Sequence, residues 1–287
     1  MNIETVGIVG AGIMGQGTAQ AVAQAGCRVV LLDVSEKILK EAEEKIRRGI
    51  RLQGLFSRAS ESDNQNQALD RIVYSTDYAL LSEIEFVVEN VTEKWETKKV
   101  VYENLERICP PECIYAANTS VIPITRLASL TDRPAKVIGM HFMNPVPMKP
   151  MVEVIRGTDT SDETLERAKL FLKRIGKSCI VVKDSPGFVL NRVLMLTINE
   201  AICLLDEKIS SAQDIDTLFK SCFGHKMGPL ETADLIGLDT ILYSLEDLHE
   251  SFKGSKFEPC PLLIRMVKEG HWGRKSGKGF YEYPVNL

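Results

Sequence analysis

The glycine-rich segment from Gly10 to Gly15 constrains the fold of this chain more than any other feature of its sequence. It reads G-A-G-I-M-G, follows the apolar stretch 3–9 and opens a predicted helix over 11–25 that is rich in small residues. A second apolar stretch, 27–32, ends at Asp33. A G-x-G-x-x-G turn between a strand and a helix, with an acid at the end of the next strand, is the dinucleotide-binding pattern. The sequence therefore predicts a βαβ unit at the start of a doubly wound sheet.

The residues of this turn each have a predicted role in binding NAD. Gly10 permits the tight turn, Gly12 lets the backbone approach the pyrophosphate, and Gly15 lets the helix pack closely on the strand. Ile13 and Met14 open the helix, where free N–H groups and the positive end of the helix dipole would face the phosphates. The alternative is an ordinary βαβ unit whose glycines serve packing alone.

Asp33 determines which dinucleotide we expect. Its carboxylate would accept hydrogen bonds from the adenosine ribose hydroxyls and would repel a 2′-phosphate. The next residues, Val34 and Ser35, supply no arginine that could reverse this preference. NAD is therefore predicted over NADP, and the alternative for Asp33 is an acid that serves only the following helix N-terminus.

Strands and helices alternate as far as about residue 185. Further strands are predicted at 71–75, 86–91, 114–117, 137–141, 151–155 and 179–182, and helices at 35–51, 95–108 and 162–175. Beyond residue 185 helical periodicity takes over, first in a helix over 188–205 whose apolar residues share one broad face: Leu190, Val193, Leu194, Thr197, Ile198, Ala201 and Leu205. We predict an α/β, Rossmann-type, mostly parallel sheet domain over 1–185 and an all-α C-terminal domain over 186–287.

The composition excludes several classes of protein. The net charge of −4 lacks the basic excess of a typical nucleic-acid binder. No apolar run approaches the roughly 20 residues that span a bilayer, and the N-terminus carries no secretion signal. The seven cysteines form neither an even disulfide framework nor a set with zinc-ligand spacing. We expect a cytoplasmic protein with no membrane partner, no nucleic-acid partner and no metal site.

Several further motifs occur in one order along the chain. They are ANTS at 117–120, VIGMHFMNPVP at 137–147, DSPGF at 184–188 with NR at 191–192, MGPL at 227–230 and GKGFY at 277–281. With the glycine-rich turn, they resemble the short-chain L-3-hydroxyacyl-CoA dehydrogenases, including bacterial 3-hydroxybutyryl-CoA dehydrogenases, over essentially the whole chain. The resemblance implies an NAD-dependent enzyme that interconverts 3-hydroxyacyl and 3-oxoacyl thioesters, and a homodimer formed through the helical domain.

The resemblance also implies the catalytic residues. It pairs His141 with Glu153, and the chemistry fits, because a histidine is a competent base at physiological pH and a carboxylate on its other ring nitrogen fixes the tautomer. It places Asn191 and Ser120 on the reacting oxygen of the substrate. Taken alone, the residues would equally fit a core histidine, a solvated glutamate, a surface asparagine and a helix-capping serine.

Further cofactor contacts follow from the resemblance alone. Glu93 and Lys98 would lie near the nicotinamide ribose, although both would equally fit solvated charges at the start of a helix. The remaining candidates for contact with NAD are Asn118, Ser120, Asn144 and, more weakly, Lys275.

A basic cluster near the end of the second helix is the candidate site for the carrier of the acyl group. It comprises Lys45, Arg47, Arg48, Arg51 and Arg58, with no acid between 45 and 58. The family has a lysine-rich stretch near here that receives coenzyme A phosphates, whereas arginines dominate in this chain. The resemblance implies acyl-CoA as the default substrate. Arginine suits phosphate and would also suit the acidic surface of an acyl carrier protein. An acyl-carrier-protein thioester and a merely solvated helix end are the alternatives.

Two other functions fit parts of the pattern. A β-hydroxyacid dehydrogenase with a catalytic lysine on the interdomain helix is disfavoured, because residues 187–192 contain no lysine. A non-catalytic NAD-binding structural protein, like the related lens crystallin, is disfavoured because His141, Glu153 and Asn191 are all present. The run 148–151, Met-Lys-Pro-Met, departs from the family pattern and alters the predicted acyl pocket, so the acyl chain is left open.

Overall fold

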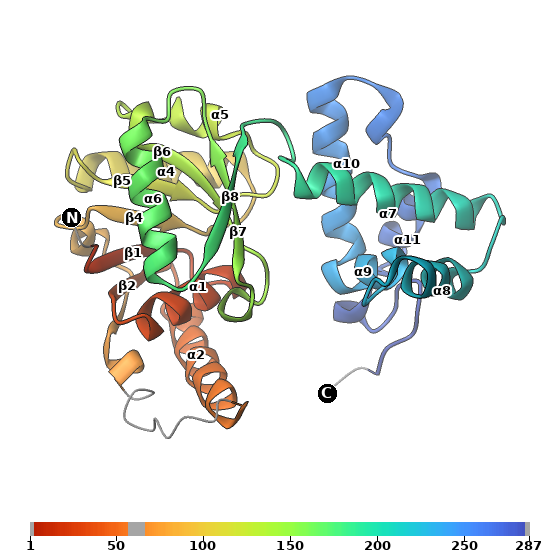
Figure 1. Ribbon diagram of the computed structural model, residues 1–287, viewed down its shortest axis with the longest axis horizontal. Helices are drawn as coiled ribbons and strands as arrows, with labels where there is room; N and C mark the ends of the chain where they lie inside the picture. The colour runs from red at the N-terminus through yellow and green to blue at the C-terminus, as the bar shows by residue number, and fades with distance from the viewer. Residues whose placement is uncertain (1–2, 57–66, 285–287) are drawn as a thin grey trace. The chain divides into compact units, whose positions relative to one another are not determined.

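The chain folds into two compact units, Met1–Ser185 and Pro186–Leu287. The computed structural model describes residues 3–56 and 67–284. Each unit has its own hydrophobic core. Figure 1 shows strands and helices in the first unit and helices in the second. The first unit contains a sheet with helices, and the described part of the second forms helices and two isolated β-bridges. The predicted order, an α/β sheet domain followed by a helical domain, is confirmed.

The sheet of the first unit has eight strands in the order β3-β2-β1-β4-β5-β6-β7-β8. Neighbouring strands are parallel except for β6 and β7, which pair antiparallel. Because β1 pairs with both β2 and β4, the strand order reverses at β1, and ligands of doubly wound sheets bind beyond the carboxyl ends of strands at such a point. The strands are β1 (Thr5–Val9), β2 (Arg28–Leu32), β3 (Ile72–Ser75), β4 (Phe86–Glu89), β5 (Ile114–Ala117), β6 (Val137–His141), β7 (Met151–Arg156) and β8 (Ser178–Lys183).

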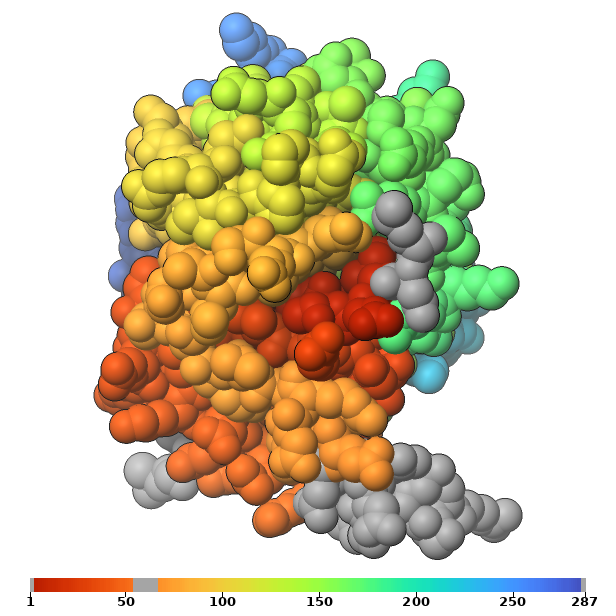
Figure 2. Space-filling view, turned by 90° about the vertical axis from the view of Figure 1, so that its left-hand side faces the viewer, coloured from red at the N-terminus to blue at the C-terminus, as the bar shows by residue number. Residues whose placement is uncertain are grey.

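Helices cover both faces of this sheet. On one face, α1 (Ile13–Gln24), α2 (Glu36–Phe56) and α6 (Asp162–Arg174) share a core with alternate strand residues such as Val6 and Ile8. On the other face, the ring of Tyr102 in α4 (Trp95–Ile108) packs edge-on against Tyr115 of β5, and α5 (Ile124–Ala128) lies against Gly139 of β6. Figure 2 shows early segments in red and orange packed against later ones in yellow and green. Short 3₁₀ turns in this unit are η1 (Tyr78–Leu81), η2 (Pro134–Lys136) and η3 (Val146–Met148).

The second unit packs its helices around a separate apolar core. The apolar face predicted for its first helix is partly wrong. Ile198 and Ala201 are buried, but Val193 is 60% exposed and the core instead takes Met195 and Ile202. Apolar residues continue around most of this helix, so periodicity alone could not select the buried side. The helices are α7 (Leu190–Asp206), α8 (Ala212–Phe223), α9 (Pro229–Ile236), α10 (Leu238–Phe252) and α11 (Pro261–Lys268), with turns η4 (Ser255–Phe257) and η5 (Arg274–Ser276).

Two buried aspartates account for the late GKGFY motif as a structural element. Asp216 accepts hydrogen bonds from the backbone N–H of Leu230 at 2.9 Å and from the Tyr281 hydroxyl at 2.7 Å. Asp234 accepts from the backbone N–H groups of Phe280 and Tyr281, both at 3.0 Å. These bonds attach the C-terminal segment to α8 and α9. In the described part of the chain, no helix is both long and apolar enough to cross a bilayer.

Candidate functional site

The glycine-rich turn joins β1 to α1 with three glycines that differ in their surroundings. Gly10 has a φ of +97°, and a Cβ there would lie 2.7 Å from the Asn90 carbonyl oxygen. A Cβ on Gly15 would lie 1.7 Å from the Gly10 carbonyl oxygen. A Cβ on Gly12 would meet nothing within 4 Å. Gly10 and Gly15 therefore serve the turn and the close helix packing, while Gly12 leaves open space over the backbone for a ligand.

The N-terminus of α1 is suited to bind an anion. Its N-cap residue, Gly12, has no side chain that could cap the helix, and no acid occupies the first turn. Within the described chain, the N–H groups of Ile13 and Met14 therefore have no side-chain cap. Asp33 lies next to the turn and accepts a hydrogen bond from the backbone N–H of Ala11 at 2.8 Å. A carboxylate has further lone pairs for ribose hydroxyls. This arrangement fits the pyrophosphate and ribose of a dinucleotide.

His141 and Glu153 face each other across the antiparallel strand pair. They are directly opposite in the register of β6 and β7, and His141 Nδ1 lies 2.9 Å from Glu153 Oε2. Each residue is only 5% exposed. An ionised Glu153 can only accept a hydrogen bond, so Nδ1 carries the proton and Nε2 of the neutral ring is an acceptor. The strand pairing thus builds a base with a fixed tautomer.

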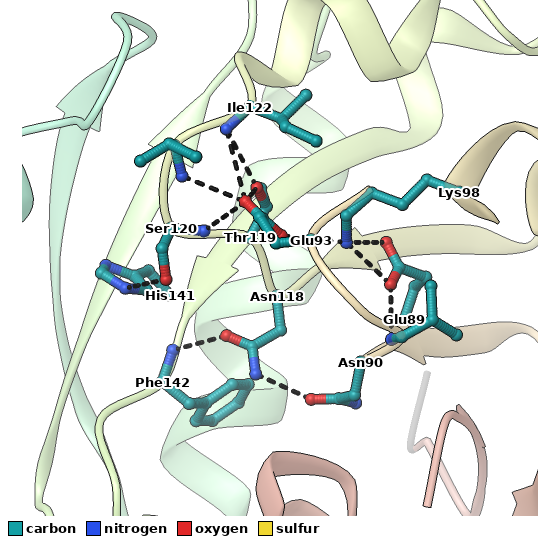
Figure 3. Close-up of polar contacts among 12 residues, drawn as sticks. Glu89, Asn90, Glu93, Lys98, Asn118, Thr119, Ser120, Ile122, His141 and Phe142 are labelled. Atoms are coloured by element: carbon teal, nitrogen blue, oxygen red, sulfur yellow. Dashed lines mark hydrogen bonds and ion pairs between the residues drawn. The ribbon is translucent and has the colours of Figure 1, made fainter. Parts of the chain in front are cut away.

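Ser120 completes this line of hydrogen bonds. It follows β5, the strand next to β6, and its Oγ lies 3.1 Å from His141 Nε2. With Nε2 as acceptor, the Ser120 hydroxyl is the donor. The arrangement therefore places three groups in sequence: a hydroxyl after β5, an imidazole at the carboxyl end of β6 and a carboxylate in the neighbouring β7. Figure 3 shows Ser120 and His141 of this line. His141 Nε2 can therefore accept a proton from a bound group and return it.

Asn118 joins the ends of three neighbouring strands. Its Nδ2 donates to Asn90 Oδ1 at 2.7 Å, and its Oδ1 accepts from the backbone N–H of Phe142 at 3.1 Å (Figure 3). Its amide therefore holds the carboxyl ends of β4, β5 and β6 together. A contact between Asn118 and NAD remains a prediction.

Glu93 and Lys98 belong to a buried network, so the alternative of two solvated charges is wrong. The Lys98 side chain is fully buried, and its Nζ lies 2.8 Å from Glu89 Oε2 and 3.4 Å from Glu93 Oε2. Glu93 in turn accepts hydrogen bonds from the loop that carries Ser120. Lys98 is therefore buried, Glu93 is partly exposed beside the Ser120 loop, and their predicted contacts with the ribose of NAD are untested.

A largely apolar groove of about 690 Å³ lies between α1, α2 and η3 of the first unit. Leu52 of α2 and Met148 of η3 line it, and Asn144 and Lys45 also contribute to its wall. Lys177 holds the η3 side in place, because its Nζ donates to the carbonyl oxygens of Val146 and Lys149 at 2.6 and 2.8 Å. The groove brings Asn144, a predicted NAD contact, and Met148 of the altered run 148–151 onto one surface with α2.

The basic cluster lies on the exposed side of α2. Arg47 pairs with Glu43 at 3.0 Å, and the partly exposed pair leaves the charge accessible to water. Arg48 and Arg51 are also exposed. Arg58 and most of the polar segment 60–67 lie outside the described residues. The described part of the cluster is therefore available to a phosphate-bearing ligand.

Two further candidates belong to the second unit. Asn191 lies in the first turn of α7, and Lys275 donates to Asp239 Oδ2 at 2.7 Å. The predicted contact of Asn191 with the substrate oxygen near His141, and that of Lys275 with NAD, would both join the two units. Both contacts stay predictions.

Three residues that organise the site were not predicted from the sequence. Glu89 is an acid within the otherwise apolar strand sequence FVVE, which is the signal that could have revealed a buried ion pair with Lys98. The Thr119 hydroxyl donates a hydrogen bond to Glu93. Threonine is common in loops, so its residue type gave no signal of this contact. Lys177 follows a helix C-terminus, where a lysine is expected to be solvated, so no pattern indicated its buried position.

Comparisons with known proteins agree with this geometry. Residues 5–185 match the NAD binding domain of 3-hydroxyacyl-CoA dehydrogenase, and residues 187–283 match its C-terminal domain. The chain is 44% identical to the 3-hydroxybutyryl-CoA dehydrogenase of Bradyrhizobium diazoefficiens, covering 98% of this chain and 96% of that protein. It is 42% identical to a probable 3-hydroxybutyryl-CoA dehydrogenase of Bacillus subtilis, covering 99% and 98%.

A solved structure shows the same likeness in three dimensions. The crystal structure of (S)-3-hydroxybutyryl-CoA dehydrogenase from Ralstonia eutropha superposes with a TM-score of 0.93 at 42% identity, covering 98% of this chain and 99% of that one. Both family domains and full-length relatives therefore match this chain in order and extent. The chain belongs to the 3-hydroxyacyl-CoA dehydrogenase family.

Proposed function

We propose that this protein is an NAD-dependent dehydrogenase that interconverts a 3-hydroxyacyl thioester and its 3-oxoacyl form, with coenzyme A as the carrier. The observation that carries the proposal is the line Ser120–His141–Glu153, built in the same unit as the dinucleotide turn. The names of the relatives supply the substrate class. A homodimer formed through the second unit and a cytoplasmic location remain predictions.

His141 is the proposed acid and base. In the oxidation direction, Nε2 takes the proton of the substrate C3 hydroxyl, and the imidazolium that forms is stabilised by Glu153 on Nδ1. When bound, NAD would supply the acceptor for the C3 hydride, and NADH would supply the donor in reduction. In reduction His141 returns the proton to the oxygen. Ser120 and, from the second unit, Asn191 orient that oxygen by hydrogen bonds.

Replacing His141 by alanine tests this function. NADH oxidation with acetoacetyl-CoA should fall by about 10² or more in kcat, because general acid–base catalysis contributes roughly that much. The exposed histidine variant His225→Ala is the matched control and should keep the wild-type rate. Full activity in His141→Ala would contradict the mechanism. NAD binding by wild type without turnover of any thioester would instead favour the non-catalytic structural protein.

We propose that the carrier's phosphates bind at the basic cluster of α2. Arg48 and Arg51 are exposed, lie three residues apart on one helix and suit phosphate oxygens. Lys45, Leu52 and Asn144 line the groove, and its largely apolar wall suits an extended, weakly polar arm. This support applies to coenzyme A and, through its phosphopantetheine, to an acyl carrier protein.

The carrier is tested by comparing kcat/KM for one acyl group on coenzyme A and on an acyl carrier protein. A higher value with free coenzyme A is expected, and a clear preference for the protein-bound thioester would reverse the assignment. Removing charge in Arg48→Gln and Arg51→Gln should raise KM for the preferred carrier, more at low salt. Lys37→Gln, an exposed charge in the first turn of the same helix, is the control. An unchanged KM would show that the cluster is only a solvated helix end.

A further inference from the structure

The loop that presents Ser120 is held by a single carboxylate. Glu93 Oε1 accepts hydrogen bonds from the backbone N–H groups of Ser120 at 2.9 Å, Val121 at 3.1 Å and Ile122 at 3.5 Å. The hydroxyl of Thr119 donates to the same oxygen. Figure 3 shows the Glu93 carboxylate at the centre of this loop. Successive N–H groups that converge on one point form an anion-binding nest, and here a side chain of the protein occupies it.

Lys98 holds this carboxylate from behind, and Glu89 in turn holds Lys98. Lys98 Nζ lies 3.4 Å from Glu93 Oε2, and it donates to both carboxylate oxygens of Glu89 at 2.9 and 2.8 Å. Glu89 and Lys98 are fully buried, and Glu89 also accepts from the backbone N–H of Val91 at 2.8 Å. The series of ion pairs Glu89–Lys98–Glu93 therefore runs from the end of β4 through α4 to the Ser120 loop.

The ionisation of the network agrees with this geometry. Burial alone would lower the pKa of Lys98, but the carboxylates of Glu89 and Glu93 raise it above its usual value. Burial alone would raise the pKa of Glu93, but Lys98, the Thr119 hydroxyl and the loop N–H groups hold it below its usual value. Lys98 is thus a cation and Glu93 an anion at neutral pH.

Such a network is costly as a purely structural device. Removing charged groups from water costs several kcal/mol for each ion, and well-packed apolar residues often serve stability as well or better. Here the network contacts the loop that carries Ser120, the residue whose Oγ lies 3.1 Å from His141 Nε2. Ser120 is thereby fixed at both ends, its N–H on Glu93 and its Oγ on His141.

We propose that Glu93 is a positioning residue that acts on the reaction through Ser120, with Glu89 and Lys98 holding its carboxylate against the loop. The inference rests on the proposed function, because it needs Ser120 to act on the reacting oxygen. It differs from a ribose contact in what it affects. A positioning role lowers kcat, whereas a ribose contact weakens NADH binding.

A double-mutant cycle of Glu93→Gln and Ser120→Ala in the full-length enzyme tests the inference, with kcat for acetoacetyl-CoA and Kd for NADH as readouts. Glu93→Gln should lower kcat by about 10²-fold, since a misplacement of about 1 Å can cost that much. In the Ser120→Ala background the same change should lower kcat by less than about 3-fold, because residues of one network are not additive. The Kd for NADH should change by less than about 3-fold in Glu93→Gln, because this change leaves the dinucleotide turn intact.

The controls separate the possible failures. Glu96→Gln removes an exposed acid from the first turn of the same helix and should leave both readouts at wild-type values. Equal loss of kcat from Glu93→Gln in both backgrounds, or a weaker NADH affinity with unchanged kcat, would overturn the positioning role alone. A wild-type rate in Ser120→Ala would overturn this inference and the proposed role of Ser120 together.

A second pair of variants covers the case in which Glu93→Gln does not fold. Thr119→Val removes the hydroxyl that donates to Glu93 while keeping the shape of the side chain, and Thr119→Ser keeps the hydroxyl. The valine variant should have the lower kcat of the two, by about 10-fold for a lost charge-assisted hydrogen bond. Equal kcat values in the two variants would count against the inference.

Discussion

At the scale of single residues, the site depends on burial, because burial strengthens the hydrogen bond between His141 and Glu153. His141 and Glu153 are each 5% exposed, so their hydrogen bond competes little with water and fixes the ring more strongly than a surface pair would. Their residue types and motif contexts were visible in the sequence. Lys98 was not recognisable in the same way, because a lysine early in a predicted helix is normally solvated.

Replacing Glu153 by glutamine separates the two effects of its carboxylate. The amide oxygen can still accept from Nδ1, but it cannot stabilise the imidazolium by charge. We expect kcat to fall by about 10²-fold or more, as for the orienting carboxylate of a catalytic triad, with KM values changed by less than about 3-fold because binding groups remain. The measurement is steady-state NADH oxidation with acetoacetyl-CoA. Glu163→Gln, an exposed acid on α6, is the control, and a Glu153→Gln kcat within twofold of wild type would refute the role.

At the scale of elements, the strands were predictable and one pairing was not. Predicted strands such as 114–117 and 137–141 coincide with β5 and β6. The antiparallel register that sets His141 opposite Glu153 was not foreseen. Buried strands of either orientation show the same apolar runs, so the sequence marks the strand but not its direction. Because the chain reverses direction between β6 and β7, two residues 12 positions apart in the sequence lie opposite each other.

The segment that makes this reversal possible depends on one buried lysine. Residues 142–150 contain Asn144 and η3, and residues 144–148 line the groove. Lys177 holds the segment with hydrogen bonds to two carbonyl oxygens. Lys177→Met should lower the free energy of unfolding by about 1–3 kcal/mol, because the buried carbonyl group of Val146 and the carbonyl group of Lys149 lose a charged donor. Urea denaturation of the variant and wild type measures the loss. A difference below about 0.5 kcal/mol, the usual range for a surface substitution, would exclude the bracing role.

The same variant has an expected pH dependence. Burial lowers the pKa of Lys177 below its usual 10.5. Between the lowered pKa and 10.5, the unfolded chain binds more protons here than the folded chain, so this group makes folding stability rise with pH. The gap in stability between wild type and Lys177→Met should therefore widen as pH rises in this window. Lys173→Met, an exposed lysine of α6, is the control for the removal of a lysine charge. A gap that narrows would refute the sign.

At the scale of the whole molecule, the proposed functions divide between two independently packed units. The dinucleotide turn, Asp33 and the Ser120–His141–Glu153 line belong to the first unit, and Asn191 belongs to the second. The change from alternating strands to helices near residue 185 was readable because periodicity changes there. The buried side of α7 was not, because apolar residues occur around most of that helix and only its packing partners select a face.

This division predicts a specific effect for Asn191→Ala. Every residue proposed for the adenosine and pyrophosphate parts of NAD lies in the first unit, so the Kd for NADH should stay within about 2-fold of wild type, as additivity of separate sites requires. The substrate oxygen would lose a hydrogen-bond donor in the transition state, which costs about 10²-fold in kcat by analogy with an oxyanion donor. Stopped-flow NADH binding and steady-state kinetics measure the two quantities. Glu200→Gln, an exposed position on the same helix, controls for changes in α7 itself. If NADH affinity and kcat fell together, Asn191 would act through the cofactor or through folding. If neither quantity changed, Asn191 would supply no polar contact to the reacting oxygen.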